Sequence, residues 1–327
     1  MPPPYLSVAV PLFNEEGNLP LFLEQLTRAC ERRTADFEII LCDDGSSDRT
    51  AELALDWRQN DPRVKLLRLS RNFGHHAAAQ AGMDHARGEW LLCIDGDLQD
   101  PPDLLDALFA KADEGFEVIH AKKRSRQESG LRGLGMRLFH SMIGHTSSDM
   151  PLEANLGYFS LIRRCAYQRL REMPERRKFL AGMRQWIGFR QAVVEFDRPQ
   201  RHAGTSRQSL RRLIVLALDA FFAYSSRPIL AIWMLGIVGI VLSLLSIGYA
   251  VVAKIQGTAL PGWSSTITAI VFIGSVQLVS VSILGEYIWR IYVEVQRRPY
   301  YLLREKHGLD SETGTPNEAD ARENAVR

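Results

Sequence analysis

The stretch Trp90-Leu91-Leu92-Cys93-Ile94-Asp95-Gly96-Asp97-Leu98-Gln99 joins an apolar run directly to two carboxylates. The run is typical of a buried strand, and ionised carboxylates at its end lose solvation unless a cation offsets the loss. A divalent cation bound to a ligand diphosphate would supply that offset, because Mg²⁺ usually takes one or two carboxylates together with phosphate oxygens and waters. An acidic loop without a function has the same pattern, so the choice between a cation site and such a loop depends on the rest of the chain.

Strands and helices alternate on both sides of this stretch. Apolar runs predict strands at 6–12, 37–42, 64–69, 90–94 and 118–121, and helical spacing predicts helices at 19–33, 50–58 and 76–86. This alternation predicts an α/β fold with a mixed, mostly parallel sheet and helices on both faces. In such sheets ligands bind beyond the carboxyl ends of the strands.

Polar clusters fall at the ends of three of these predicted strands, and their members are Pro11, Asn14, Glu15, Asp43, Asp44, Asp95 and Asp97. Asp43 and Asp44 can accept hydrogen bonds from a base or ribose, and Gly45 lets the backbone turn away. An ordinary turn before a helix has the same residues, so we favour a ligand contact for Asp44 and a helix N-cap for Asp48. Glu15 either contacts a nucleoside or favours the positive end of the next helix.

Asp97 is the expected metal ligand, with Gln99 as a neutral oxygen donor and Asp95 contacting the ribose, the metal or both. His75 and His76 suggest zinc, but two adjacent imidazoles alone are a poor ligand pair. We therefore interpret the two histidines as polar residues at the start of a helix.

Two long stretches without charge, residues 228–253 and 255–285, are each long enough to cross a membrane, which takes about 20 apolar residues. Basic residues flank the pair, so the positive-inside rule predicts a hairpin with both ends in the cytoplasm. We divide the chain into a cytoplasmic α/β domain at 1–205, an amphipathic membrane-surface helix at 206–227, two transmembrane helices at 228–290 and a cytoplasmic tail at 291–327 that is disordered at its end.

The net charge of +2 argues against a nucleic-acid partner. The four cysteines, Cys30, Cys42, Cys93 and Cys165, have neither zinc spacing nor a disulfide framework, so we expect reduced thiols.

Several motifs occur in one order: Pro11-x-x-Asn14-Glu15, Asp43-Asp44-Gly45-Ser46-Ser47-Asp48, Arg71-Asn72-Phe73-Gly74 and Asp95-x-Asp97-x-Gln99-Asp100-Pro101-Pro102. In this order they resemble glycosyltransferase family 2, and within it the polyprenyl-phosphate glycosyltransferases, which include dolichyl-phosphate mannose synthase and bacterial undecaprenyl-phosphate enzymes. Ala203-Gly204-Thr205-Ser206-Arg207 is similar to the Ala-Gly-x-Ser-Lys segment of that family, with Arg in place of Lys. Leu284–Ile288 and Arg297–Tyr301 extend the likeness to about residue 305.

The resemblance implies a GT-A (Rossmann-like) domain that uses Mg²⁺ or Mn²⁺, with Asp97 and Gln99 as metal ligands and Asp95 contacting donor and metal. It implies nucleotide-sugar contacts from Pro11, Asn14, Glu15, Asp43, Asp44, Ser206 and Arg207. Arg124, Arg132 and Arg137 would bind the acceptor lipid phosphate, Arg124 with a catalytic role. The alternative for these arginines is a solvated basic face that attracts anionic membrane lipid.

One departure from the family concerns an Asp that many relatives carry. Its equivalent here is Asn155 or Tyr158, depending on the alignment. The loss need not abolish transfer, because a phosphate monoester nucleophile has a second pKa of about 6. It is largely a dianion near neutral pH and requires no strong general base.

These features predict an inverting transferase, anchored in the bacterial inner membrane, that moves one sugar from a nucleotide sugar to polyprenyl phosphate for the cell envelope. The identity of the sugar stays open, UDP is favoured only by analogy, and a homo-oligomer is possible but not required.

A non-catalytic scaffold that binds sugar nucleotides is one alternative function. A processive polysaccharide synthase is disfavoured, because Arg184-Gln185-Trp186 lacks the order Gln-x-x-Arg-Trp and two spans cannot enclose a glycan channel. The spans contain no charge of the kind that usually marks a transport route, which disfavours a transporter.

Overall fold

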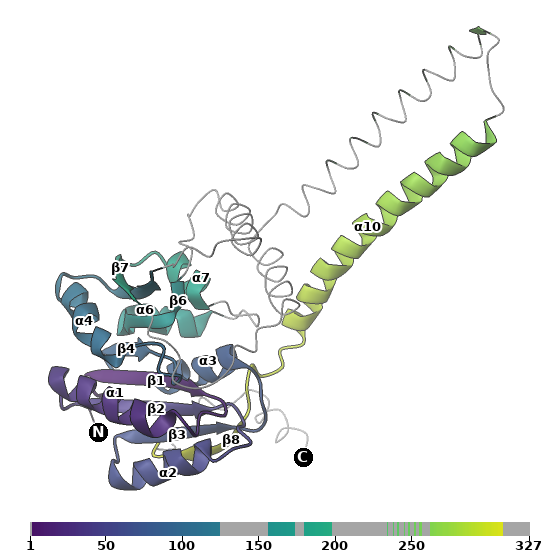
Figure 1. Ribbon diagram of the computed structural model, residues 1–327. Helices are drawn as coiled ribbons and strands as arrows, with labels where there is room; N and C mark the ends of the chain where they lie inside the picture. The colour runs from purple at the N-terminus through teal and green to yellow at the C-terminus, as the bar shows by residue number, and fades with distance from the viewer. Residues whose placement is uncertain are drawn as a thin grey trace, which may run out of the picture. The chain divides into compact units, whose positions relative to one another are not determined.

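The computed structural model describes residues 2–124, 156–173, 180–197 and 262–309, with scattered positions between 234 and 256. Its centre is an eight-stranded sheet in the order β7-β5-β6-β4-β1-β2-β3-β8 (Figure 1). The strands are β1 (Leu6–Leu12), β2 (Phe37–Asp43), β3 (Val64–Leu69), β4 (Trp90–Cys93), β5 (Val118–Lys123), β6 (Leu156–Arg163), β7 (Gln191–Phe196) and β8 (Leu303–His307).

The sheet is mixed and mostly parallel, as expected from the sequence. β1 pairs in parallel with β2 and β4, β2 with β3, and β5 with β7. β6 runs antiparallel to β4 and β5, and β8 runs antiparallel to β3. The register sets Leu12 opposite Asp43 and Ala9 opposite Cys93, so the carboxyl ends of β1, β2 and β4 lie at one edge of the sheet.

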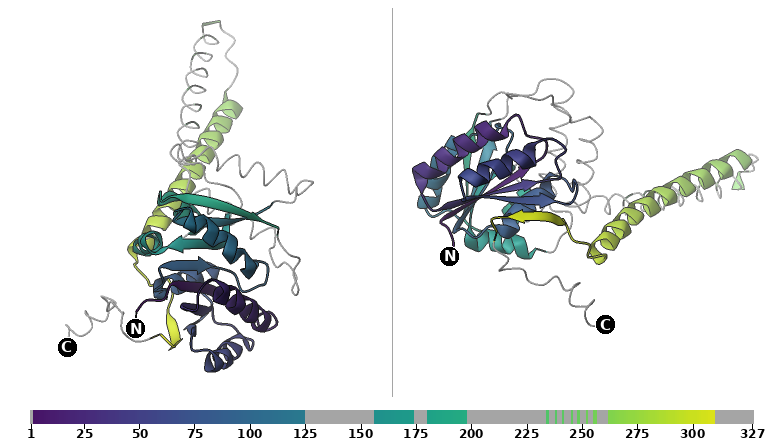
Figure 2. Two further views of the ribbon diagram at one scale, coloured as in Figure 1. Left: turned by 90° about the vertical axis from the view of Figure 1, so that its left-hand side faces the viewer. Right: turned by 90° about the horizontal axis from the view of Figure 1, so that it is seen from below.

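Helices cover both faces, which confirms the second part of the expectation (Figure 2). One face carries α1 (Leu19–Arg33), α2 (Thr50–Asn60), α4 (Leu105–Asp113) and the short 3₁₀ helix η1 (Pro102–Leu104). The other face carries α3 (His75–His85), α6 (Arg164–Glu172) and α7 (Leu180–Trp186).

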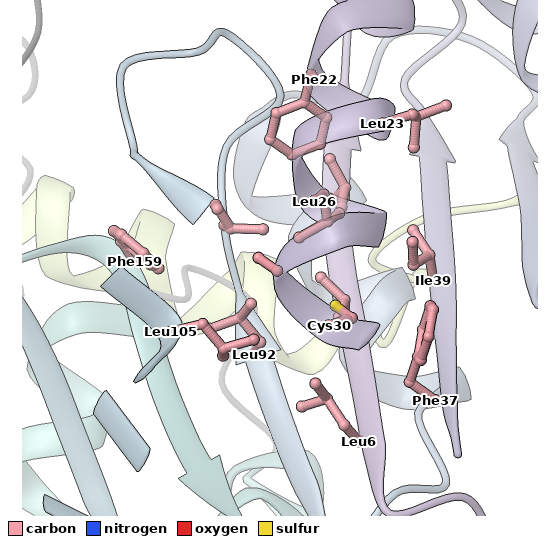
Figure 3. Close-up of a cluster of buried hydrophobic side chains, with 14 of the residues drawn as sticks. Leu6, Phe22, Leu23, Leu26, Cys30, Phe37, Ile39, Leu92, Leu105 and Phe159 are labelled. Carbon is pink, nitrogen blue, oxygen red and sulfur yellow. The ribbon is translucent and has the colours of Figure 1, made fainter. Parts of the chain in front are cut away.

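Alternation along the central strands builds two cores. Val8 and Val10 point to the side of α1, whereas Ala9 between them packs on the side of α3. Figure 3 shows Phe22 and Leu26 of α1 directed at the sheet, and both are fully buried. Each such side chain contributes about 1.5–3 kcal/mol when it leaves water, so the apolar face of α1 secures the helix to the strands.

Small residues let α3 approach the sheet closely. A Cβ added to Gly82 would lie 2.8 Å from the Cβ of Ala9 and 3.0 Å from the Sγ of Cys42. Cys42 is buried, as are Cys30 and Cys93, and all four cysteines are free, in line with the expected reduced thiols.

Several element boundaries differ from the sequence prediction by one or two residues. β4 ends at Cys93 rather than Ile94, α3 begins at His75 rather than His76, and β5 continues to Lys123. These residues belong to polar or mixed segments, where the hydrophobic pattern that locates the elements fades.

The long helix α10 (Trp263–Val295) belongs to a second unit, separate from the α/β unit. Within the described residues, one helical segment, Phe272–Val295, is long and apolar enough to span a membrane by length and composition. The predicted second transmembrane helix ends at residue 290, whereas α10 continues to Val295 and includes Glu286, because glutamate is a good helix former and its charge ends no helix. The predicted surface helix at 206–227, most of the first predicted span and the end of the tail lie outside the described residues.

The chain after α10 returns to the sheet. Residues 299–309 group with the α/β unit, and β8 pairs with the edge strand β3. The backbone N–H of Ser70 donates to the carbonyl of Leu302 at 2.8 Å, and the Tyr301 hydroxyl donates to Asp84 at 3.1 Å. Part of the segment treated as a tail is therefore built into the α/β domain.

Candidate active site

The loops after β1 and β2 are joined by hydrogen bonds at the carboxyl edge of the sheet. The Ser47 backbone N–H donates to Asn14 Oδ1 at 2.9 Å, the Asn14 N–H donates to Ser46 Oγ at 3.0 Å, and the Glu15 N–H donates to Thr50 Oγ1 at 2.8 Å. Asn14 has a φ of 55°, a left-handed conformation that Asn tolerates better than most residues. The two polar clusters predicted at these strand ends thus form one surface.

Residues around this surface have defined partners. Pro11 is buried within β1, and the Glu15 carboxylate accepts a hydrogen bond from the Asn18 side chain at 2.7 Å. Asp48 accepts from the backbone N–H of Thr50 at 3.0 Å. The N-cap of α2 is Arg49 rather than the predicted Asp48. The Asp48 carboxylate still accepts a backbone N–H of the first turn of that helix.

Asp43 is fully buried at the end of β2. Its Oδ1 accepts the Ser46 backbone N–H at 3.0 Å, and its Oδ2 lies 3.4 Å from Nε of Arg68 on β3. Arg68 in turn lies 3.5 Å from a carboxylate oxygen of Glu305 on β8. A buried carboxylate needs a nearby cation, and Arg68 is that cation for Asp43.

Asp44 secures the loop that precedes α3. Its two carboxylate oxygens accept the backbone N–H groups of Phe73 at 2.7 Å and Gly74 at 2.9 Å. Burial raises the pKa of Asp44, and these two hydrogen bonds work against that rise. Gly45, at a φ of 68°, leaves room for this loop, because a Cβ there would lie 2.7 Å from the backbone carbonyl carbon of Arg71.

The stretch after β4 carries the predicted metal ligands in a tight turn. Gln99 donates its backbone N–H to Asp97 Oδ1 at 3.1 Å, and Leu98 between them has a φ of 60°. Such backbone strain is found at functional sites, where the surroundings hold it in place. Asp95 Oδ1 lies 2.7 Å from Nε2 of His75 at the start of α3.

Charges converge on this turn. Lys123, at the end of β5, lies 3.0 Å from Asp100 Oδ1. Burial, and next the neighbouring charge of Asp95, raise the pKa of Asp100 to about 6, against the effect of Lys123. Burial also acts to raise the pKa of Asp95, but the hydrogen bond and charge of His75, with Lys123 beyond it, bring that pKa below its usual value.

The residues present fit a divalent cation in one specific respect. Gln99 is buried, yet neither its amide oxygen nor its amide nitrogen has a hydrogen-bond partner in the described part of the chain. An orphaned buried amide next to two carboxylates is suited to an added ligand. Among the described residues, no three His, Cys, Asp or Glu side chains gather as a metal site of their own. The predicted site needs only two carboxylates and Gln99, because phosphate oxygens and waters complete the usual Mg²⁺ shell.

Two predicted residues have unexpected surroundings. The Arg124 side chain is 60% exposed, and its guanidinium lies 3.5 Å from Glu195 and 3.4 Å from Asp197. Tyr158 is buried, and its hydroxyl donates to the carbonyl of Ala9 at 3.4 Å. Tyr158 therefore cannot serve as the acid that many relatives carry. Arg132, Arg137, Asn155, Ser206 and Arg207 lie outside the described residues.

Sequence reasoning missed two residues of this site. Lys123 is the last residue of β5 and belongs to the basic run 122–126, which is the sequence signal that could have identified it. His75 lies at the start of α3, as the sequence predicts, but its contact with Asp95 has no sequence signal.

Comparison with known proteins identifies the family. Residues 7–171 match Glycosyl transferase family 2. An uncharacterized glycosyltransferase of Synechocystis sp. is 37% identical over 93% of this chain and 96% of its own length. The SfII prophage-derived bactoprenol glucosyl transferase of Shigella flexneri is 34% identical over 92% of this chain and 98% of its own length. A prophage bactoprenol glucosyl transferase homolog of Escherichia coli is 33% identical over 91% of this chain and 98% of its own length. With its sheet, its strand-end motifs and these relatives, the chain belongs to glycosyl transferase family 2.

Proposed function

We propose that this glycosyltransferase moves one sugar from a nucleotide diphosphate sugar, with UDP favoured, to polyprenyl phosphate, with inversion at the anomeric carbon. The supporting observation is the turn Asp95–Gln99, where two carboxylates and an orphaned buried amide meet beyond the end of β4. Relatives named bactoprenol glucosyl transferases match more than nine tenths of the chain, which supports a polyprenyl acceptor.

On the donor side, Asp97, Gln99 and Asp95 would hold Mg²⁺ or Mn²⁺. When bound, the cation supplies Lewis-acid neutralisation of the charge that develops on the leaving diphosphate. Asp43 and Asp44 border the nucleoside region, together with Pro11, Asn14 and Glu15. Lys123 adds a cation beside Asp100, where it lowers the cost of gathering several carboxylates in one buried place.

On the acceptor side, the phosphate of the lipid is the nucleophile. It is already largely a dianion near neutral pH, since its second pKa is about 6, so the chain needs no carboxylate at Tyr158 to activate it. Arg124, together with Arg132 and Arg137, would orient this phosphate toward the anomeric carbon. Good orientation alone can contribute on the order of 7–11 kcal/mol to the lowering of a barrier.

Membrane attachment is part of the proposal, because the acceptor remains in the bilayer. The segment Phe272–Val295 supports attachment by its length and composition. With the first predicted span at 228–253 it would form a hairpin that keeps the α/β domain on the cytoplasmic side of the inner membrane.

A transfer assay tests the proposal. The full-length protein in detergent is supplied with Mg²⁺, undecaprenyl phosphate and a panel of radiolabelled nucleotide sugars, and label entering the lipid phase is counted. We expect label from one donor, none with undecaprenol in place of the phosphate, and none with a chelator. Mass analysis of the product should show one added sugar per lipid, whereas a processive synthase would give a ladder. Nucleotide binding without any transfer would favour the scaffold alternative.

A further inference from the structure

The segment Arg71–His76 lies between two acidic parts of the site. On one side its backbone is bound to Asp44, and on the other side the His75 ring reaches Asp95 on the neighbouring loop. Resting on the proposed function, we propose that His75 is a positioning residue: its Nε2–H holds Oδ1 of Asp95, so that Asp95 binds the divalent cation through Oδ2 in one fixed orientation.

The backbone of His75 is fixed before its side chain is considered. Asp44 accepts from the N–H groups of Phe73 and Gly74, the two residues that precede His75. Gly74 has a φ of 100°, which few other residues adopt, and it turns the chain directly into α3. His75 thus starts the helix at a point set by the neighbouring acidic loop.

The ring of His75 is fixed as well. An ionised carboxylate only accepts, so Nε2 carries the proton in the 2.7 Å contact with Asp95. The ring meets Tyr158 edge to face, with centroids 5.3 Å apart and planes at 86°. Tyr158 is itself held in place, because the buried guanidinium of Arg184 donates to its backbone carbonyl at 2.8 Å. A ring with one hydrogen bond and edge-to-face contacts to Tyr158 and His76 has little freedom to turn Asp95 elsewhere.

Other roles for His75 account for less of this geometry. As a plain residue at a helix start it would lie at the positive end of the helix, which favours an acidic side chain over a basic one. It is not a cap, since α3 has no side-chain capping hydrogen bond. A zinc pair with His76 is disfavoured, because the two rings are 5.5 Å apart at 84° and no group of three ligands occurs among the described residues.

Groups that orient metal ligands typically change metal affinity by about 10–100-fold when they are removed. The test measures Mn²⁺ binding to the full-length protein in the presence of UDP, with free Mn²⁺ followed by electron paramagnetic resonance. His75→Ala should weaken Mn²⁺ binding by about 10–100-fold. His75→Gln should stay within about threefold, because its amide N–H can replace the Nε2–H toward Asp95. His76→Ala removes a ring that touches His75 but keeps the hydrogen bond to Asp95, so this matched control should also stay within about threefold.

The outcomes separate this proposal from the function it rests on. If the unchanged protein binds no Mn²⁺ with UDP, the metal part of the proposed function fails, and the role of His75 fails with it. If Asp97→Ala abolishes Mn²⁺ binding while His75→Ala leaves it intact, the site stands and the positioning role is wrong. Equal loss in His75→Ala and His75→Gln also overturns the role, because the restored hydrogen bond should rescue binding.

Discussion

The carboxylate of Asp44 accepts the backbone N–H of Gly74 at 2.9 Å, which ties the end of β2 to the start of α3 across thirty residues of sequence. The same carboxylate also accepts the N–H of Phe73. Asp44, a residue of the predicted nucleotide site, therefore also stabilises the fold, because it holds the loop that carries His75 to Asp95.

Asp44→Asn should loosen this loop. The amide offers one acceptor where two N–H donors converge, and losing a hydrogen bond to a charged group costs about 1.5–3 kcal/mol. We expect a lower midpoint of thermal unfolding and weaker UDP binding, measured by calorimetric titration. Asp103→Asn is a matched control, since its side chain is 83% exposed and lies outside the site, beside Arg32, and should change neither quantity. Equal stability of Asp44→Asn and the unchanged protein would contradict the account.

Gly45→Ala should be among the most damaging single-methyl changes in the domain. Its Cβ would lie 2.7 Å from the backbone of Arg71, and the φ of 68° adds strain. Non-glycine residues held in such regions cost on the order of 1–3 kcal/mol before any clash is counted. Gly17→Ala, where nothing lies within 4 Å of the added Cβ, should fold like the unchanged protein. Circular dichroism during heating distinguishes the two, and similar curves for both variants would be inconsistent with the loop packing described above.

The strands β1 to β5 could be predicted because they are apolar runs flanked by turn residues, and Asp43, Asp44, Asp95 and Asp97 lie where those runs end. The edge strand β8 could not, because Leu303–His307 contains more charged than apolar residues. Its strand conformation depends on pairing with β3, a partner more than 200 residues earlier in the chain. Propensity and pattern describe neighbours in sequence and cannot supply such a partner.

Removing one partner of a buried ion pair inside the sheet should lower the stability of the fold strongly. Lys65 of β3 pairs with Glu38 of β2, and their side chains are only 7% and 3% exposed. Glu38 also accepts from the Ser7 hydroxyl at 2.5 Å and from the Arg87 backbone N–H at 3.1 Å. Lys65→Met removes the nearer of the two cations at this carboxylate and leaves only the Arg87 guanidinium, 3.5 Å away, so we expect a loss of up to about 3–5 kcal/mol in the free energy of unfolding.

The double variant Lys65→Met with Glu38→Met checks the reason for that loss. Replacing a buried ion pair by apolar groups is often close to neutral, so part of the stability should return. Urea unfolding of the single and double variants measures this recovery. A double variant less stable than Lys65→Met alone would show that the other partners of Glu38 outweigh the charge.

His120 predicts acid sensitivity. Burial, and next the charge of Arg184, lower the pKa of His120 to about 4, while its hydrogen bond to Gln191 works the other way. In the unfolded chain this histidine has a pKa of about 6.5, so as the pH falls it binds a proton in the unfolded state before it does so in the folded state. The contribution of neutral His120 to stability is therefore complete above pH 6.5 and is lost as the pH falls toward 4. His120→Gln keeps a donor toward Gln191 without titrating. Its stability should fall less steeply between pH 6.5 and 4.5, and an identical slope would contradict the shifted pKa.

The contact between His75 and Asp95 also lay beyond sequence reasoning, although both residues were noted. The segment around His75 follows β3 and Asp95 follows β4, and these strands are separated in the sheet by β1 and β2. Only the loop before α3, which Asp44 holds by two backbone N–H groups, brings His75 to the β4 loop. Composition and spacing locate the two polar segments, but the fold decides which side chains meet.

The most direct test of the central claim compares Asp97→Ala with Asp103→Ala in the lipid transfer assay, using the donor that the panel identifies. The account predicts that Asp97→Ala lowers label in the lipid phase by about a hundredfold or more, since several kcal/mol of charge stabilisation would be lost. Asp103→Ala, six residues away and outside the site, should transfer at the unchanged rate. Full transfer by Asp97→Ala would contradict the assignment of the Asp95–Gln99 turn as the catalytic centre.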